Sequence, residues 1–154
     1  MASRQIVVIN DEMVQLHLIG RMLEGAGYET SRHIDSSEAL SRLESRPQVD
    51  LFVVDLHMPG IDGWKVCRLL RSPEFQHYND TPILVVSATF TGADVESITA
   101  DIGADGFLPM HLTRQGVRLT LSAFRIAWIP IRPNCRAARS NALRSLGPWR
   151  VRRR

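Results

Sequence analysis

Three short apolar runs constrain the fold of this chain more than any other feature. They are residues 6–9, 51–54 and 83–86, and each is followed at once by polar side chains. Runs of this length, rich in valine and isoleucine, are typical of strands that are buried on both faces of a sheet. Weaker strand patterns at residues 28–33 and 106–108 complete a set of five.

The segments that join these strands have helical periodicity, with apolar residues recurring every three or four positions. The residues that mark the buried faces are Leu16, Ile19, Leu23; Ala39, Leu40, Leu43; Trp64, Cys67, Leu70; Val95, Ile98, Ile102; and Val117, Leu121, Phe124, Trp128. Asp35, with Glu38 three residues later, is typical of a capped helix start. Alternating strands and helices predict an α/β fold with a parallel sheet that is covered on both faces. A common version of this architecture, and the one we expect, is the flavodoxin-like, three-layer (βα)5 domain with a five-stranded parallel sheet in the order 2-1-3-4-5.

Polar residues stand where three of the predicted strands end. Asp11 follows the first strand, Asp55 the third and Ser87 the fourth. In a parallel sheet of this order these strands are neighbours, and ligands bind outside their carboxyl ends. We therefore expect Asp11, Asp55 and Ser87 to converge on one pocket.

Two carboxylates that lie a few ångströms apart repel each other unless a cation lies between them. Mg²⁺ is suited to this place, because it prefers oxygen ligands and typically uses one or two carboxylates together with phosphate oxygens. A carboxylate beside Mg²⁺ can act as a nucleophile toward phosphorus and form an aspartyl-phosphate. The alternative is structural: Asp11 or Glu12 caps the helix that follows, and Ser87 only ends a strand.

The segments around these residues resemble the motifs of the response regulator receiver domains of two-component signal transduction. Residues 53–63 (VVDLHMPGIDG) are similar to the phosphorylation-site segment of that family, and residues 9–12 (INDE) resemble its acidic cluster. Residues 82–88 resemble its fourth strand, and residues 103–108 resemble the segment that leads to its fifth strand. The resemblance covers residues 4–128, which we predict to be the receiver domain.

The resemblance implies a role for each site residue. Asp55 is the expected phosphoacceptor, Ser87 contacts the phosphoryl group, and Phe107 is the aromatic residue whose rotamer reports the switch. The implied Mg²⁺ site comprises Asp11, Asp55, the backbone carbonyl of His57 and, acting through water, Asn10.

The resemblance also implies partners. The phosphoryl donor is a phosphohistidine on a sensor histidine kinase or a phosphotransfer protein. The signal passes to a downstream protein partner, and the face around the fourth helix, fifth strand and fifth helix serves for such contacts or for a homodimer. Such a domain is a signalling phosphoacceptor rather than an enzyme.

Two residues depart from the family pattern. Asn10 stands where the family usually has an acid, and Met110 stands where it has a lysine that is usually followed by proline. Methionine brings no cation to the phosphoryl group. Because the usual Lys-Pro bond can be cis, we considered a cis bond between Leu108 and Pro109 instead.

These departures leave two interpretations open. In the first, Asp55 is phosphorylated but the switch is weakly coupled; in the second, the domain is a pseudo-receiver that signals by protein contact alone. We favour the first, since the metal ligands and the nucleophile remain. An enzyme with a flavodoxin-like fold is disfavoured, because no glycine-rich phosphate loop follows the first strand.

Charge is segregated along the chain. Residues 1–112 carry a net charge of −8, and residues 113–154 carry +11 from arginines alone. We predict that residues 129–154 form a tail outside the domain: a basic arm, a disordered linker remnant, or the product of out-of-frame translation. Specific binding to nucleic acid is not expected of it. The run at residues 6–9 is too short for a signal peptide or a membrane span, so we expect a cytoplasmic protein.

Overall fold

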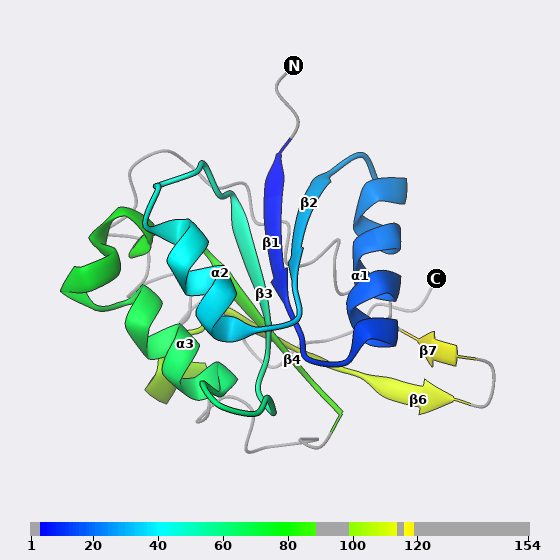
Figure 1. Cartoon of the computed structure of the whole chain (residues 1–154). Helices are drawn as coiled ribbons and strands as arrows, with labels where there is room; N and C mark the ends of the chain where they lie inside the picture. The colour runs from blue at the N-terminus through cyan, green and yellow to red at the C-terminus, as the bar shows by residue number, and fades with distance from the viewer. Residues whose placement is uncertain (1–3, 89–98, 114–115, 119–154) are drawn as a thin grey trace, which may run out of the picture.

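The computed structural model describes residues 4–88, 99–113 and 116–118, with side chains through residue 110 (Figure 1). In chain order the elements are β1 (Gln5–Ile9), α1 (Met13–Gly25), β2 (Glu29–His33), α2 (Ser36–Leu43), β3 (Leu51–Asp55), α3 (Gly63–Leu70), the 3₁₀ helix η1 (Pro73–Tyr78), β4 (Ile83–Ser87), β5 (Gly106–Pro109), β6 (His111–Thr113) and β7 (Gly116–Arg118). Within these residues no helix is long and apolar enough to cross a membrane.

The central sheet is parallel and has the order β2-β1-β3-β4-β5, which confirms the predicted fold class and topology. In the register, Ile9 pairs with Val54 and Asp55 pairs with Val86. The carboxyl ends of β1, β3 and β4 therefore meet at one edge of the sheet, which is the arrangement that the sequence predicted for the site.

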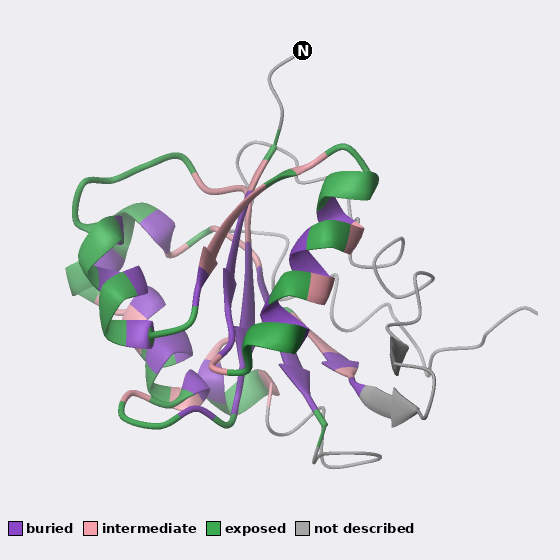
Figure 2. Ribbon diagram, turned by 45° about the vertical axis from the view of Figure 1, so that its right-hand side comes forward, coloured by how far each residue is buried: buried purple, intermediate pink, exposed green. Residues whose placement is uncertain are grey.

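The core is divided by the sheet into two layers. One layer joins alternate strand residues, such as Phe52 and Val54, to the apolar faces of α2 and α3; Cys67 is fully buried there. The other layer joins the intervening strand residues, such as Val53, to Leu16 and Ile19 of α1. Figure 2 shows the buried strands between these helices. The arrangement is the three-layer sandwich that continuous apolar strands require.

Two helices begin at aspartate caps. The Asp35 carboxylate accepts a hydrogen bond of 2.9 Å from the backbone N–H of Glu38, as the sequence predicted for α2. The Asp62 carboxylate accepts one of 2.8 Å from the N–H of Lys65 at the start of α3. These contacts satisfy backbone donors that the first turn of a helix leaves unpaired.

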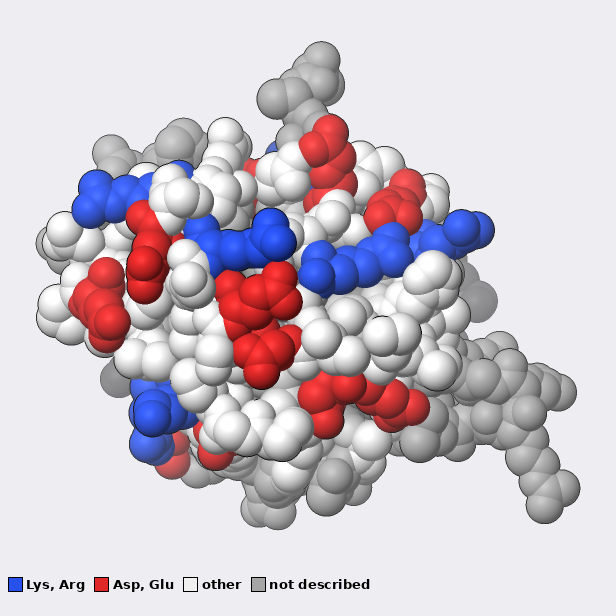
Figure 3. Space-filling model, viewed as in Figure 1, with Lys and Arg blue, Asp and Glu red and all other residues white. Residues whose placement is uncertain are grey.

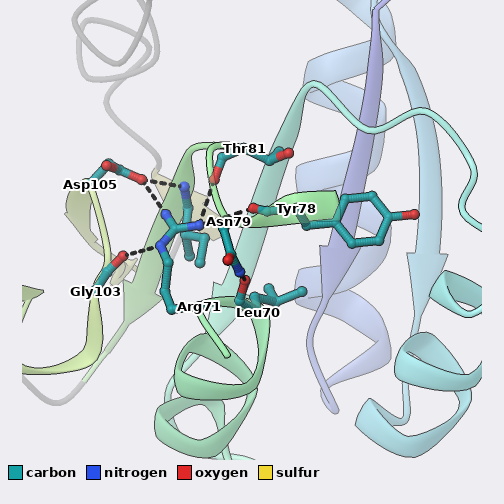
Figure 4. Close-up of polar contacts among 8 residues, drawn as sticks. Leu70, Arg71, Tyr78, Asn79, Thr81, Gly103 and Asp105 are labelled. Carbon is teal, nitrogen blue, oxygen red and sulfur yellow. Dashed lines mark hydrogen bonds and ion pairs between the residues drawn. The ribbon is translucent and has the colours of Figure 1, made fainter. Parts of the chain in front are cut away.

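The amino edge of the sheet, opposite the carboxyl ends, is tied together by polar side chains (Figure 4). The Arg71 guanidinium, at the end of α3, donates to the carbonyls of Thr81 (2.9 Å) and Gly103 (2.9 Å) and to the Asp105 carboxylate (2.7 Å). The Tyr78 hydroxyl donates to the carbonyl of Pro47 at 2.8 Å. These bonds connect the segments that lead into β3, β4 and β5.

The structure corrects the prediction for the segment after β5. The sequence pattern placed Val117 at the start of the last amphipathic helix, but Val117 lies in β7, which pairs antiparallel with β6. The expected helix positions Leu121, Phe124 and Trp128 lie outside the described residues, as do Val95 and Ile98 and the predicted tail. No cis peptide bond occurs in the described chain, so the Leu108–Pro109 bond is trans.

Charged side chains of both signs are interspersed on the face seen in Figure 3. Some form ion pairs, including Arg42 with Glu38 at 3.2 Å and Arg32 with Glu24.

Candidate functional site

A cavity of about 400 Å³ opens at the carboxyl ends of β1 and β3. It is lined by Asp11, Glu12, Gln15, Asp55, His57, Ala88 and Met110. Asp11, Asp55 and His57, which the sequence analysis singled out, are thus brought together. Their convergence follows from the strand order, because β1 and β3 are neighbours.

Asp55 is the last residue of β3 and is only 8% exposed. Burial raises the pKa of its carboxyl above the ordinary value, and the negative charge of Asp11 raises it further. The backbone N–H of His57, 3.2 Å from Asp55 Oδ1, acts in the opposite direction because it favours the ionised form. The Asp55 carboxylate is therefore an electrostatically unsatisfied group that a cation would stabilise.

The loop after Asp55 is held against the strand by the start of α3. The backbone N–H of Gly63 donates to the Leu56 carbonyl at 3.1 Å. A Cβ atom on Gly63 would lie 2.0 Å from the Asp55 carbonyl oxygen, so a side chain does not fit there. Gly60 in the same loop has a φ of +75°, which glycine adopts without the cost that a side chain would bring. The two glycines let the loop fold back beside the acceptor strand.

Asn10 is fully buried beneath the cavity, and its amide is engaged on both sides. Its Oδ1 accepts a hydrogen bond of 2.8 Å from the backbone N–H of Glu12. Its Nδ2 donates to Gln15 Oε1 at 3.1 Å, and Gln15 Nε2 donates in turn to the Glu12 carboxylate. The Glu12 side chain makes no cap bond to α1, although Glu12 is the N-cap residue.

Neither Ser87 nor Phe107 lines the cavity. Ser87 is buried at the end of β4, and its carbonyl accepts the N–H of Met110 at 2.9 Å. Phe107 is half-buried against the layer that contains α2 and α3. Met110 is 3% exposed and packs in the α1 layer, so a thioether forms part of the cavity wall beside the carboxylates.

The donor set is compatible with Mg²⁺. Among the described residues no three His, Cys, Asp or Glu side chains are close enough to hold a metal ion together. Asp11 and Asp55 supply two carboxylates, and His57 also lines the cavity. Magnesium in proteins usually has one or two carboxylates and keeps several waters, so this set is sufficient for it.

Sequence reasoning did not identify Gln15 as part of the site. The only signal was a polar side chain on the otherwise apolar face of α1, three residues after Glu12 and next to Leu16. In a helix, residues three apart are neighbours, which brings the Gln15 and Glu12 side chains together.

A family model for the response regulator receiver domain matches residues 6–120. The chain belongs to this family. Among curated response regulators, the transcriptional regulatory protein YvrH of Bacillus subtilis (strain 168) is 32% identical over 108 residues, and PrrA of Mycobacterium leprae (strain TN) is 35% identical over 108 residues. Each alignment covers 70% of this chain and 43% of the relative, so the receiver chain spans less than half the length of these proteins.

Solved receiver structures share the fold. Chemotaxis protein CheY4 of Vibrio cholerae superposes with a TM-score of 0.69 at 22% identity, over 82% of this chain and 99% of CheY4. A response regulator receiver protein from Pseudomonas putida superposes with a TM-score of 0.65 at 20% identity, over 82% of this chain and 96% of that one. The receiver fold predicted from the motifs is thereby confirmed.

Proposed function

We propose that this receiver domain accepts a phosphoryl group on Asp55 from a phosphohistidine of a sensor histidine kinase or phosphotransfer protein. The observation that carries the proposal is the placement of the buried Asp55 carboxylate at a strand end, in one cavity with Asp11. Membership of the receiver family supports the class of donor.

In the proposed reaction an oxygen of the Asp55 carboxylate forms a bond to phosphorus as the bond between phosphorus and the histidine nitrogen breaks. The departing imidazole keeps the electron pair of that bond and takes up a proton, and Asp55 becomes an acyl phosphate. Asp11, Asp55 and the carbonyl of His57 are the residues that would hold Mg²⁺. When bound, the ion supplies positive charge that offsets the repulsion between the carboxylates and the phosphoryl oxygens.

The chain's own groups prepare Asp55 for this step. The N–H of His57 orients one carboxylate oxygen, and the contact between Gly63 and the Asp55 main chain fixes the end of β3. Ser87 is expected to contact the phosphoryl group. Phe107 is expected to change its rotamer when the domain switches. Asn10 is proposed to act on the ion indirectly, without touching it.

We further propose that the phosphorylated domain changes its contacts with a downstream protein partner in the cytoplasm. The face around β5 and its flanking helices is the proposed surface for that partner or for a homodimer. Strand β5 lies at the edge of the central sheet, as such a surface requires, and most of the residues on either side of it in the chain lie outside the described residues. The proposed domain limits, residues 4–128, also extend beyond them.

The buried Met110 favours a second function, that of a pseudo-receiver. The cavity wall is apolar where a cation would stabilise a phosphoryl group, so the domain would then act only as an interaction module. Intact Asp11 and Asp55 make phosphorylation the better-supported function.

Intact-mass measurement after incubation with Mg²⁺ and acetyl phosphate distinguishes the two functions. We expect one added phosphoryl group on the wild-type chain and on an Asp101→Asn control, in which the substituted residue is an exposed aspartate away from the cavity. The Asp55→Asn variant should gain none. If the wild type gains no mass, the pseudo-receiver function is the correct one; if Asp55→Asn gains the same mass as the wild type, Asp55 is not the phosphoacceptor.

A further inference from the structure

The geometry points to Glu12 as a third carboxylate of the cation site, held toward the cavity by Gln15 and Asn10 and acting on the ion through water. This inference rests on the proposed function, because it assigns a role toward the same Mg²⁺. Gln15 and Asn10 are then positioning residues, and the neutral amide of Asn10 contributes through Glu12.

The hydrogen bonds fix the direction in which the Asn10 amide acts. Its oxygen is held by the N–H of Glu12 and its nitrogen is held by Gln15 Oε1. The amide is uncharged. Because the residue is fully buried, it also has no atom exposed at the cavity. Its effect on a cation must therefore pass through the residues that it orders.

Gln15 transmits this order to Glu12. The glutamine is 6% exposed and stands at the third position of α1, where a polar side chain usually returns to the backbone N–H of the N-cap residue. Here Asn10 already accepts that N–H, so the Gln15 amide instead joins Asn10 Nδ2 to the Glu12 carboxylate. With its oxygen facing a donor and its nitrogen facing a carboxylate, the amide has one favourable orientation.

The charges around the cavity favour a role for Glu12 toward a cation. Its lining includes three carboxylates, those of Asp11, Glu12 and Asp55, and no lysine or arginine among the described residues. Glu12 is exposed, and no three such side chains lie close enough for direct ligation within the described chain. A water-mediated contact satisfies both facts, since Mg²⁺ releases its waters reluctantly.

Calorimetric titration of the full chain with MgCl₂ at fixed ionic strength, without phosphodonor, tests the inference. Glu12→Gln should weaken Mg²⁺ binding by about fivefold, the size expected of one carboxylate that acts on a divalent ion through water. Gln15→Met removes the hydrogen bonds of Gln15 to Asn10 and Glu12 at similar side-chain volume, and it should weaken Mg²⁺ binding by half as much, roughly 2.5-fold. Glu44→Gln, the same charge change at the far end of α2, should leave the affinity within about twofold.

A second pair of variants tests the link to Asn10. In an Asn10→Asp background, which places a carboxylate beneath the cavity, Glu12→Gln should weaken Mg²⁺ binding less than it does in the wild type. Coupling of this kind is expected only if the two positions serve the same ion. An effect of Glu12→Gln that is equal in both backgrounds would overturn the assignment of Asn10 as a positioning residue.

The outcomes separate this inference from the proposed function. If Glu12→Gln binds Mg²⁺ as the wild type does while Asp11→Asn does not, Glu12 has no role and the proposed function stands. If the wild type shows no saturable Mg²⁺ binding, both are overturned. Glu12 is exposed, so its variant should fold, and circular dichroism checks this before titration.

Discussion

The guanidinium of Arg71 lies 2.7 Å from the carboxylate of Asp105 and joins the end of α3 to the start of β5. The same carboxylate accepts the N–H of Ile83 at 2.9 Å, so one ion pair fixes the entrances of β4 and β5 together. The Arg71 side chain is 14% exposed and that of Asp105 is 40% exposed, so the ion pair is shielded from water on the arginine side only.

Arg71→Ala should therefore destabilise the fold by about 2–3 kcal/mol, because several acceptors lose a charged donor at once. Urea unfolding of the variant measures this change. Arg68→Ala, an exposed arginine one turn earlier in α3, serves as the control and should change stability by less than about 0.5 kcal/mol. Equal losses in the two variants would contradict the role of the Arg71 network.

His33 should make the fold sensitive to mild acid. Burial lowers the pKa of its imidazole, and the negative charge of Glu38, whose carboxylate is 3.8 Å from Nδ1, opposes this shift without reversing it. Among described residues His33 Nδ1 has no hydrogen-bond partner. Since the unfolded chain takes up the proton at higher pH than the folded chain, stability should fall as the pH drops below about 6.5.

Urea midpoints measured between pH 5 and 8 test this dependence. His33→Gln, which keeps a polar side chain but does not titrate, should flatten the acid side of the curve. His77→Gln, which changes an exposed histidine, should leave the curve as it is in the wild type. A wild-type slope that persists in His33→Gln would assign the acid sensitivity to another group.

Gly63→Ala should damage both the fold and the site. The added Cβ would meet the carbonyl oxygen of Asp55 at 2.0 Å and the Cα of Leu56 at 2.7 Å, and backbone atoms yield less than side chains do. We expect a loss of about 1–3 kcal/mol, together with slower phosphorylation of Asp55. Unfolding and mass measurements on one preparation give both values.

Gly25→Ala is the matched control for that substitution. Gly25 is the last residue of α1, and a Cβ there would meet nothing within 4 Å. Because alanine favours helix, this variant should be at least as stable as the wild type and should accept the phosphoryl group at the same rate. Comparable damage in both variants would show that the contact with Asp55 is not the cause.

Met110→Lys should strengthen the response to phosphorylation, since it places a cation in the cavity wall beside Asp55 and Asp11. The change in amide NMR resonances on phosphorylation should be larger than in the wild type. Met110→Leu, which alters shape without charge, should respond as the wild type does. The lysine variant should also be less stable, because Met110 is buried in the α1 layer. An unchanged response in Met110→Lys would count against weak coupling as the consequence of methionine.

The apolar runs predicted the strands because buried parallel strands have a simple pattern, and the alternation with helices favoured the common order 2-1-3-4-5. Asp55 and Asp11 could be placed in one cavity from that order alone. The contacts of Gln15 could not, because they depend on which side chain accepts the N–H of Glu12. Val117 was assigned to a helix because apolar spacing alone does not distinguish a helix start from a short hairpin strand.

The bonds made by Arg71 and Tyr78 fasten the amino edge of the sheet, and the carboxyl edge holds the cavity with its carboxylates. The strands are thus anchored at their amino ends, and the reactive groups lie at their carboxyl ends. Substitutions at the amino ends can therefore change the free energy of unfolding while the carboxylates at the carboxyl ends stay in place. In this chain, thermodynamic stability and phosphorylation can therefore be engineered as separate properties.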